Sequence, residues 1–233
     1  MGEKKPLLVL FDGNAIVHRA YHALPPLAVT KTGEATGAVY GFASMVLKVL
    51  ADLKPTHYAI AFDYPAPTFR HREFAAYKAQ RPPAPEELRS QFDRVRQLVQ
   101  AFNIPSFEVE GYEADDILGT LAHQASAQGI DTIIVTGDLD TLQLVSPRVR
   151  VLTPRPGRSF SDTVLYDEER VREKYGISPP QLADLKGLKG DPSDNIPGVP
   201  GIGEKTAIKL IQTFGSVEEI YAHLDEITPP KVK

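Results

Sequence analysis

Carboxylates follow the apolar runs of this chain in positions where they could bind metal ions. Three short runs of the strand type lead into aspartate, at Asp12, at Asp63, and at Asp138 with Asp140. A single aspartate after a strand is usually a turn residue or a helix cap. In an open α/β sheet, however, ligands bind at the carboxyl ends of the strands, so side chains at three such ends would converge on one crevice.

Two further acidic groups extend this pattern. Glu113, Asp115 and Asp116 stand at an expected helix start, and Asp191 and Asp194 are one helical turn apart. Taken singly, the first group could be N-terminal helix charge, and the second could begin with a cap before a proline. Taken together, nine carboxylates facing one crevice would repel one another unless divalent cations held them. The predicted metal ligands are Asp12, Asp63, Glu113, Asp115, Asp116, Asp138, Asp140, Asp191 and Asp194.

The other potential metal ligands narrow the choice of ion. The chain has no cysteine, which excludes disulfides, thiolate zinc sites and a cysteine nucleophile. Its six histidines show no metal-ligand spacing. We interpret His18 and His22, four residues apart on a helix without a nearby carboxylate partner, as surface or groove residues. All-oxygen ligation favours Mg²⁺ or Mn²⁺, and because Mg²⁺ keeps several waters, nine carboxylates imply two or more ions.

Charge and size restrict the class of substrate. The 233 residues include 26 basic and 30 acidic side chains, for a net charge of −4. Setting aside the nine predicted ligands leaves 21 acidic residues, so the rest of the chain has an excess of five positive charges. A basic surface around an acidic metal pocket suits a polyanion whose phosphates meet the metals. No apolar run approaches the roughly 20 residues of a membrane span, and the first run is too short for a signal peptide.

Short strands and helices alternate along the chain. The apolar runs predict buried parallel strands, and a 3-4 spacing of apolar residues between them predicts helices. This alternation predicts an α/β fold with a mostly parallel central sheet flanked by helices. The predicted strands are Leu7–Phe11, His57–Phe62, Thr132–Val135 and Val149–Leu152, and the predicted helices run from Val39 to Leu53, from Leu88 to Phe102 and from Glu113 onward.

A long insertion follows the second predicted strand. Residues 64–85 contain five prolines and a basic cluster that includes Arg70, Lys78 and Arg81. Insertions of this length in a compact domain are often functional. A solvated basic surface is the alternative interpretation of Lys78 and Arg81.

A second irregular segment, residues 187–203, is dense in glycine and proline and precedes a predicted helix over 204–214. The turn around Gly201 and Gly203 would let backbone N–H groups approach a phosphate, with the helix N-terminus adding partial positive charge. Lys205 and Lys209 could then contact neighbouring phosphates without reading sequence. A glycine-rich turn capping an ordinary helix is the alternative. The predicted buried face of the helix is Ala207, Leu210, Ile211 and Phe214.

Together these segments resemble the 5′-nuclease (flap endonuclease-like) family, and most closely the N-terminal 5′→3′ exonuclease domains of bacterial DNA polymerase I. The resemblance covers nearly the whole chain. It rests on Phe11-Asp-Gly13, Ala61-Phe-Asp63, Tyr77-Lys-Ala-Gln-Arg81, Gly111-Tyr-Glu-Ala-Asp-Asp116, Gly137-Asp-Leu-Asp140, Leu188-Lys-Gly-Asp-Pro-Ser-Asp-Asn195 and the glycine hairpin. It implies a PIN-like 5′-nuclease fold with a catalytic domain over residues 1–176, a helical arch or clamp over 64–100, and a helix–hairpin–helix DNA-binding subdomain over 177–233 that is cut short near Leu224–Lys231.

The family's acidic set falls on all nine carboxylates. The resemblance therefore implies a structure-specific 5′→3′ exonuclease and flap endonuclease that hydrolyses DNA with two or more Mg²⁺ or Mn²⁺ ions, leaving 5′-phosphate and 3′-hydroxyl ends, in replication and repair. Leu139 stands where the family often has Lys or Arg, which would slightly weaken phosphate attraction. The implied catalytic residues are Lys78, Arg81 and Asp116, and the implied DNA contacts are Arg70, Tyr77, Lys78, Arg81, Gly201, Gly203, Lys205 and Lys209.

The resemblance also suggests how the carboxylates divide between the ions. Asp191 and Asp194 would serve the second ion, and Asp12 and Asp63 would lie beside the first. Tyr77 and Tyr112 could stack on bases or could simply pack. The group assigned to the first ion and its water shell is Glu113, Asp115, Asp116, Asp138 and Asp140.

The expected partners are DNA with 5′ flaps or ends, an RNA primer paired with DNA, and a potassium ion at the hairpin. A polymerase domain in the same natural chain is favoured over the alternative of a short free-standing relative. We expect a monomer in the bacterial cytoplasm, associated with the nucleoid, with no membrane contact. Two alternatives stay open: a helix–hairpin–helix DNA-binding module without catalysis, and an RNase of related fold. The intact acidic set argues against the first, and the arch with its hairpin argues against the second.

Overall fold

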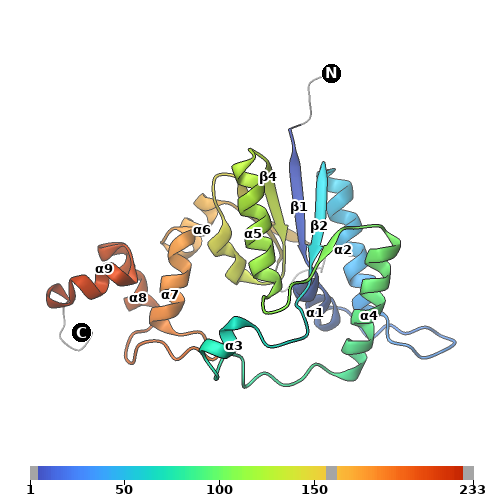
Figure 1. The fold of residues 1–233 in the computed structure, drawn as a ribbon, viewed down its shortest axis with the longest axis horizontal. Helices are drawn as coiled ribbons and strands as arrows, with labels where there is room; N and C mark the ends of the chain where they lie inside the picture. The colour runs from blue at the N-terminus through green and yellow to red at the C-terminus, as the bar shows by residue number, and fades with distance from the viewer. Residues whose placement is uncertain (1–4, 156–161, 228–233) are drawn as a thin grey trace.

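A six-stranded sheet forms the centre of the molecule. The computed structural model describes residues 5–155 and 162–227. The strand order is β3-β2-β1-β4-β5-β6 (Figure 1). Strands β1 to β5 are parallel, and β6 runs antiparallel to β5. The strands are β1 (Leu7–Asp12), β2 (His57–Ala61), β3 (Ser106–Phe107), β4 (Asp131–Val135), β5 (Val149–Pro154) and β6 (Thr163–Tyr166).

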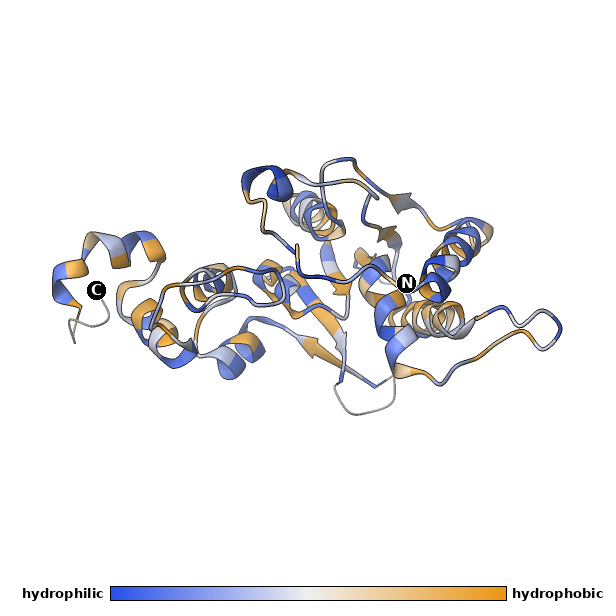
Figure 2. Ribbon diagram, turned by 90° about the horizontal axis from the view of Figure 1, so that it is seen from below, coloured by the Kyte–Doolittle hydropathy of each residue, from blue (hydrophilic) through white to orange (hydrophobic). Residues whose placement is uncertain are grey.

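Helices α1 (Gly13–Ala23), α2 (Gly37–Leu53) and α4 (Glu86–Ala101) cover one face of the sheet. Successive side chains of a strand point to opposite faces, so Val9 and Phe11 of β1 belong to this side. Helices α1 and α2 pack closely because Gly41 presents no side chain: a Cβ there would lie 2.6 Å from the Cβ of Ala20. Figure 2 shows the apolar strands between helices on both sides.

Helix α5 (Ala114–Ala127) covers the opposite face, where Leu10 of β1 is buried. The same apolar cluster continues without a break into the C-terminal helices, through Leu185 of α7 and Ile211 of α8. The helices of this part are α6 (Glu168–Tyr175), α7 (Leu182–Lys189), α8 (Glu204–Phe214) and α9 (Val217–Ala222), with 3₁₀ turns η1 (Leu139–Leu144), η2 (Pro179–Gln181) and η3 (Leu224–Glu226).

The predicted fold class is confirmed, and all four predicted strands are present. Two strands were not predicted. Strand β3 has only two residues, both exposed, and β6 is a short edge strand in which one of four residues is buried. Strand β3 is too short to show an apolar run, whereas the run Val164–Tyr166 of β6 is present in the sequence but was not interpreted as a strand.

The predicted arch over 64–100 contains two different structures. Its first part has one short helix, α3 (Phe69–Glu73), followed by turns and extended chain that pass below the carboxyl edge of the sheet (Figure 1). Its second part is α4, whose residues Leu88, Val95 and Val99 are buried against α1 and α2, so this half belongs to the helical layer. The predicted C-terminal segment Leu224–Lys231 lies partly outside the described residues. No helix in the described ranges is long and apolar enough to cross a membrane.

Candidate metal centre

Asp12 anchors the site at the end of the central strand. Its carboxylate caps α1 by accepting a hydrogen bond of 2.8 Å from the Ala15 N–H, and it accepts another of 2.7 Å from the Thr136 hydroxyl. The next residue, Gly13, lets the Phe62 ring approach, since a Cβ at Gly13 would lie 2.3 Å from that ring. This close approach holds the ends of β1 and β2 together, and with them Asp12 and Asp63.

Asp63 connects β2 to the start of α5. Its backbone N–H donates to the side chain of Asn14 at 3.1 Å, and its carboxylate accepts from the Ala114 N–H at 2.7 Å. Glu113 is the N-cap residue of α5, and Asp115 lies in the first turn. The strand end and the helix start therefore bring acidic groups from distant parts of the sequence into one place.

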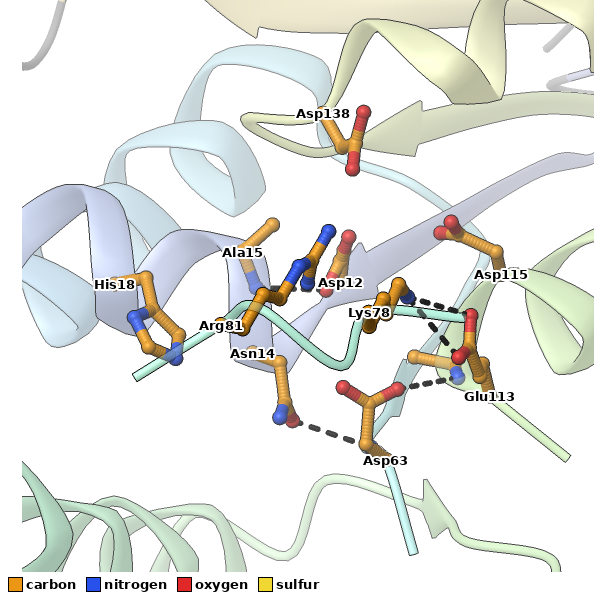
Figure 3. Close-up of a pocket in the computed structure, with 11 residues that line it drawn as sticks. Asp12, Asn14, Ala15, His18, Asp63, Lys78, Arg81, Glu113, Asp115 and Asp138 are labelled. Carbon is orange, nitrogen blue, oxygen red and sulfur yellow. Dashed lines mark hydrogen bonds and ion pairs between the residues drawn. The ribbon is translucent and has the colours of Figure 1, made fainter. Parts of the chain in front are cut away.

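These residues surround a cavity of about 250 Å³ at the carboxyl edge of the sheet. Figure 3 shows the carboxylates converging on it from several elements, with Lys78 and Arg81 entering from the insertion. The carboxylates that line this cavity are Asp12, Asp63, Glu113, Asp115 and Asp138. His18 lines it as well.

A second cavity of about 330 Å³ adjoins the first and shares Lys78, Glu113, Asp115 and Asp138 with it. It adds Asp140, Asp191 and Asp194. Among the described residues, these last three form the one group of at least three His, Cys, Asp or Glu residues whose ligand atoms all lie within 4.8 Å of one another. Together the two cavities form one acidic cleft, lined by eight of the nine predicted ligands.

The grouping of Asp140 differs from the expected division between ions. The resemblance implied that Asp140 serves the first ion, but the structure places its carboxylate beside Asp191 and Asp194. Asp140 lies in η1, after the chain has left β4, and η1 packs against α7. A tight turn then presents the other two, because the backbones of Asp191 and Ile196 exchange hydrogen bonds of 2.8 Å.

Asp116 is the predicted ligand that lines neither cavity. Its carboxylate accepts two hydrogen bonds from Arg70, at 2.8 and 2.7 Å, and one of 2.9 Å from the Glu113 N–H. Burial alone would raise the pKa of Asp116, but these hydrogen bonds from Arg70 and Glu113 bring it below its usual value. In this structure Asp116 therefore positions Arg70 and the start of α5 beside the cleft.

Asp12 and Asp115, in the first cavity, have the opposite electrostatic character. Burial raises the pKa of Asp12 to about 7, against its hydrogen bonds, and the charges of Asp63 and Asp138 add to the increase. Burial, followed by the charges of its acidic neighbours, raises the pKa of Asp115 well above the usual range. Oxygen ligands at this density, with too few cations beside them to favour ionisation, match the donor set of Mg²⁺ or Mn²⁺.

Basic side chains of the insertion face the cleft. The Lys78 Nζ lies 3.0 Å from each carboxylate oxygen of Glu113. Tyr77 is 7% exposed and its hydroxyl donates to Glu113 at 3.1 Å, so its ring packs rather than presenting a face to a base. Tyr112, at 50% exposed, leaves its ring accessible. Arg81 pairs with Asp194 at 2.6 Å.

Residues 76–81 of the insertion are attached to the turn at 192–195. The Lys78 N–H donates to the Asp194 carbonyl at 3.1 Å, and the Asn195 side chain donates to the Ala76 carbonyl at 2.7 Å. Gln80 donates to the Pro192 carbonyl at 2.7 Å. The insertion thus extends from β2 across the acidic cleft to the C-terminal helices.

The glycine hairpin links α7 to α8 beside this cleft. Gly201 has a φ of +84°, which glycine adopts without strain, and Gly203 is the N-cap residue of α8. Lys205 and Lys209 are exposed on α8. The predicted buried face is confirmed: Ala207, Leu210 and Ile211 are buried, and the partly buried Phe214 packs against the same cluster.

The sequence did not indicate the carboxylate neighbours of two residues of the site, His18 and Lys186. His18, predicted to be a surface or groove residue, does line the cavity, but it lies there with a carboxylate neighbour, Asp63, that was not expected. Its position on α1, whose N-cap is Asp12, was the available signal. Lys186 forms ion pairs with Asp140 and with Asp191, the second at 2.6 Å. Its spacing of five residues from Asp191 gave no such indication.

Two family models match the chain. The model described as the 5′-3′ exonuclease N-terminal resolvase-like domain matches residues 7–176, and the model described as the 5′-3′ exonuclease C-terminal SAM fold matches residues 177–233. DNA polymerase I of Bacillus caldotenax is 51% identical over 229 residues, and DNA polymerase I of Chloroflexus aurantiacus is 53% identical over 222 residues. These alignments cover 98% and 94% of this chain, which spans only about a quarter of each relative, 26% and 24%.

Solved structures share the fold at low sequence identity. A zinc-bound T5 5′-exonuclease has a TM-score of 0.76 and 22% identity, over 97% of this chain and 82% of that chain. A complex of the T5 D15 flap endonuclease with DNA and metal ions has the same TM-score, identity and coverage. The two family models together span this chain from residue 7 to its last residue, and polymerase relatives share about half of its residues, so the chain belongs to the 5′-3′ exonuclease family.

Proposed function

We propose that this chain hydrolyses DNA phosphodiester bonds at 5′ ends and at the base of 5′ flaps, using two or more Mg²⁺ or Mn²⁺ ions. The observation that carries the proposal is the acidic cleft: eight carboxylates from separate elements line two adjoining cavities beneath a basic insertion. Family membership supports a nuclease, and the cleft identifies where in this chain the chemistry would take place.

The two groups of carboxylates suit two ion positions. Asp12, Asp63, Glu113, Asp115 and Asp138 line the first cavity, and Asp140, Asp191 and Asp194 converge in the second. When bound, the ions would lower the pKa of an attacking water and stabilise the leaving 3′ oxygen, which gives a 5′-phosphate and a 3′-hydroxyl.

The surrounding side chains would hold the substrate. Lys78 and Arg81 stand over the cleft, where they could stabilise the charge of the phosphate under attack. The N-terminus of α8, with the exposed Lys205 and Lys209, offers backbone N–H groups and positive charge to the DNA backbone. A potassium ion held by carbonyls of the hairpin near Gly201 would add a further contact of this kind.

The wider setting of the reaction is also a proposal. The relatives are bacterial DNA polymerases I about four times as long as this chain and support a polymerase domain in the same natural chain, with removal of RNA primers paired with DNA as the task. We place the protein at the bacterial nucleoid, acting as a monomer.

Cleavage of an end-labelled 5′-flap duplex tests the proposed function. The experiment compares the wild type in Mg²⁺ and in EDTA with Asp115→Asn and with a control, Asp131→Asn. Asp131 pairs with Arg148 at the start of β4, far from the carboxyl edge of the sheet. We expect Mg²⁺-dependent cutting near the flap junction in the wild type and the control, and loss of at least about 100-fold in Asp115→Asn. Tight binding without cutting would favour the non-catalytic module, and preferential cutting of RNA would favour the RNase.

A further inference from the structure

Lys186 places its ammonium group among the carboxylates of the second cavity. Its Nζ pairs with Asp191 at 2.6 Å and also with Asp140, so one ammonium bridges both side chains. Two carboxylates in direct contact with the ammonium favour its charged form. The lysine is therefore a fixed positive charge within the acidic cleft.

An ammonium and a divalent cation require the same oxygens here. The ligand oxygens of Asp140, Asp191 and Asp194 lie within 4.8 Å of one another, and Lys186 already contacts two of the three residues. A cation that binds all three must either displace the ammonium or accept a positive charge as its neighbour. Either route makes the divalent cation bind more weakly.

Lys186 differs from the other cations of the cleft in the rigidity of its support. It projects from α7, which Leu182, Leu185 and Leu188 anchor in the apolar core. Lys78 and Arg81 come instead from the insertion, much of which is turn and extended chain. The amine of Lys186 thus stays within reach of Asp140 and Asp191 whatever conformation the insertion adopts.

We propose that Lys186 sets the affinity of the second ion position by competing with the divalent cation for Asp140 and Asp191. In the metal-free protein it supplies part of the counter-charge for this group, and it keeps the second position weaker than the carboxylates alone would make it. The inference rests on the proposed function, because it assumes that the group binds a divalent cation.

Binding of Mn²⁺ to the whole chain without DNA, followed by electron paramagnetic resonance of free Mn²⁺, tests this role. Lys186→Met removes the charge but keeps an unbranched side chain, and Lys186→Arg keeps the charge. Lys189→Met is the matched control, because Lys189 lies in the same helix but pairs with Glu204 at 2.7 Å. We expect Lys186→Met to tighten the weaker Mn²⁺ site about tenfold, since one positive charge beside the ion is removed. Lys186→Arg and Lys189→Met should stay within about twofold of the wild type.

The outcomes separate this inference from the proposed function. If the wild type binds and cleaves but Lys186→Met binds Mn²⁺ equally or more weakly, the competition is wrong and the lysine has only a structural role. Equal tightening in Lys186→Met and Lys189→Met would also overturn it, because a general charge effect would suffice. Failure of the wild type to bind Mn²⁺ would overturn the proposed function as well. Adding Asp194→Asn to Lys186→Met should remove the gained affinity for Mn²⁺.

Discussion

The residues of the cleft divide by the charge that faces them. Burial and acidic neighbours raise the pKa of Asp12, Asp115 and Asp140, although Lys186 partly opposes the increase at Asp140. Burial would also raise the pKa of Asp191, but hydrogen bonds from Lys186 and Ser193 lower it to about 2. The carboxylates without a nearby cation are therefore difficult to ionise, whereas Asp191, which Lys186 contacts, ionises readily.

The metal-free protein should lose stability as pH rises above 6.5. A carboxyl whose pKa is higher in the folded state contributes stability that is present below its unfolded value, 3.8, and is lost as pH rises through the folded value, about 7 for Asp12. Most of this stability is lost between the two values, and roughly 1 kcal/mol of the loss for Asp12 falls between pH 6.5 and 8. The measurement is the free energy of unfolding in EDTA between pH 6.5 and 8, repeated with saturating Mg²⁺, which should remove most of the decrease.

His18, Asp116 and Asp191 also change stability with pH, but mainly below this range. The lowered pKa of His18, caused by burial and then by the charge of His22, affects stability below pH 6.5, where it acts in the opposite direction. The lowered pKa values of Asp116 and Asp191 affect stability near and below 3.8. Asp12→Asn should flatten the decrease in EDTA. If the free energy of unfolding of the wild type in EDTA is constant from pH 6.5 to 8, the raised pKa of Asp12 is wrong.

At the level of elements, the turn after α7 fixes the second group of carboxylates. Gly190 and Gly198 meet there at backbone distance: a Cβ on Gly198 would lie 2.3 Å from the Gly190 N atom, and the φ of Gly198 is +68°. Only glycine fits both demands without moving the backbone. The two glycines enclose the segment that carries Asp191 and Asp194.

Gly198→Ala should destabilise the protein by about 1–3 kcal/mol, because the added methyl group must displace backbone and adopt a left-handed conformation. It should also weaken Mn²⁺ binding by moving Asp191 and Asp194. Gly187→Ala in α7 is the matched control, because a Cβ there meets nothing within 4 Å. This substitution should stabilise the protein by roughly 0.5–1 kcal/mol. Thermal unfolding and Mn²⁺ titration measure both effects. If the two variants behave alike, the turn does not depend on this close approach.

The elements that sequence could predict were those with strong local signals. Continuous apolar runs marked β1, β2, β4 and β5, and the 3-4 spacing marked α2, α4 and α5. Strand β3 has only two residues and leaves no such run, and the short run of β6, Val164–Tyr166, was not interpreted as a strand. The spacing that predicted α4 did not show which surface its apolar face covers. Its burial against α1 and α2 depends on tertiary packing.

The metal site could likewise be predicted only where local sequence signals determine it. Convergence of Asp12, Asp63 and Asp138 follows from the rule that strand ends meet at one edge. The placement of Asp140 with Asp191 depends instead on how η1 packs against α7, which no local pattern contains. Lys186 was missed for the same reason, since its partners become visible only once two segments distant in sequence are packed together.

On the scale of the whole molecule, basic side chains lie both at the acidic cleft and on the C-terminal helices. The insertion contributes Lys78 and Arg81, which line the cleft, and α8, which packs against α7, contributes the exposed Lys205 and Lys209. The insertion joins the two parts physically through its hydrogen bonds to the 192–195 turn. A duplex held by α8 would therefore place a strand end near the carboxylates while its backbone runs along the C-terminal helices.

This arrangement predicts that α8 contributes to affinity and the cleft to chemistry. Lys205→Ala with Lys209→Ala should weaken flap-DNA binding and reduce the slope of log affinity against log salt by about 2, because each lysine that contacts a phosphate releases about one counterion. The cleavage rate at saturating DNA should change little. Fluorescence anisotropy across a salt series, in an Asp115→Asn background that does not cut, measures the slope. Lys48→Ala is the control, because Lys48 pairs with Asp52 on the outer side of α2. An unchanged slope in the double variant would mean that Lys205 and Lys209 do not contact the phosphates of the duplex.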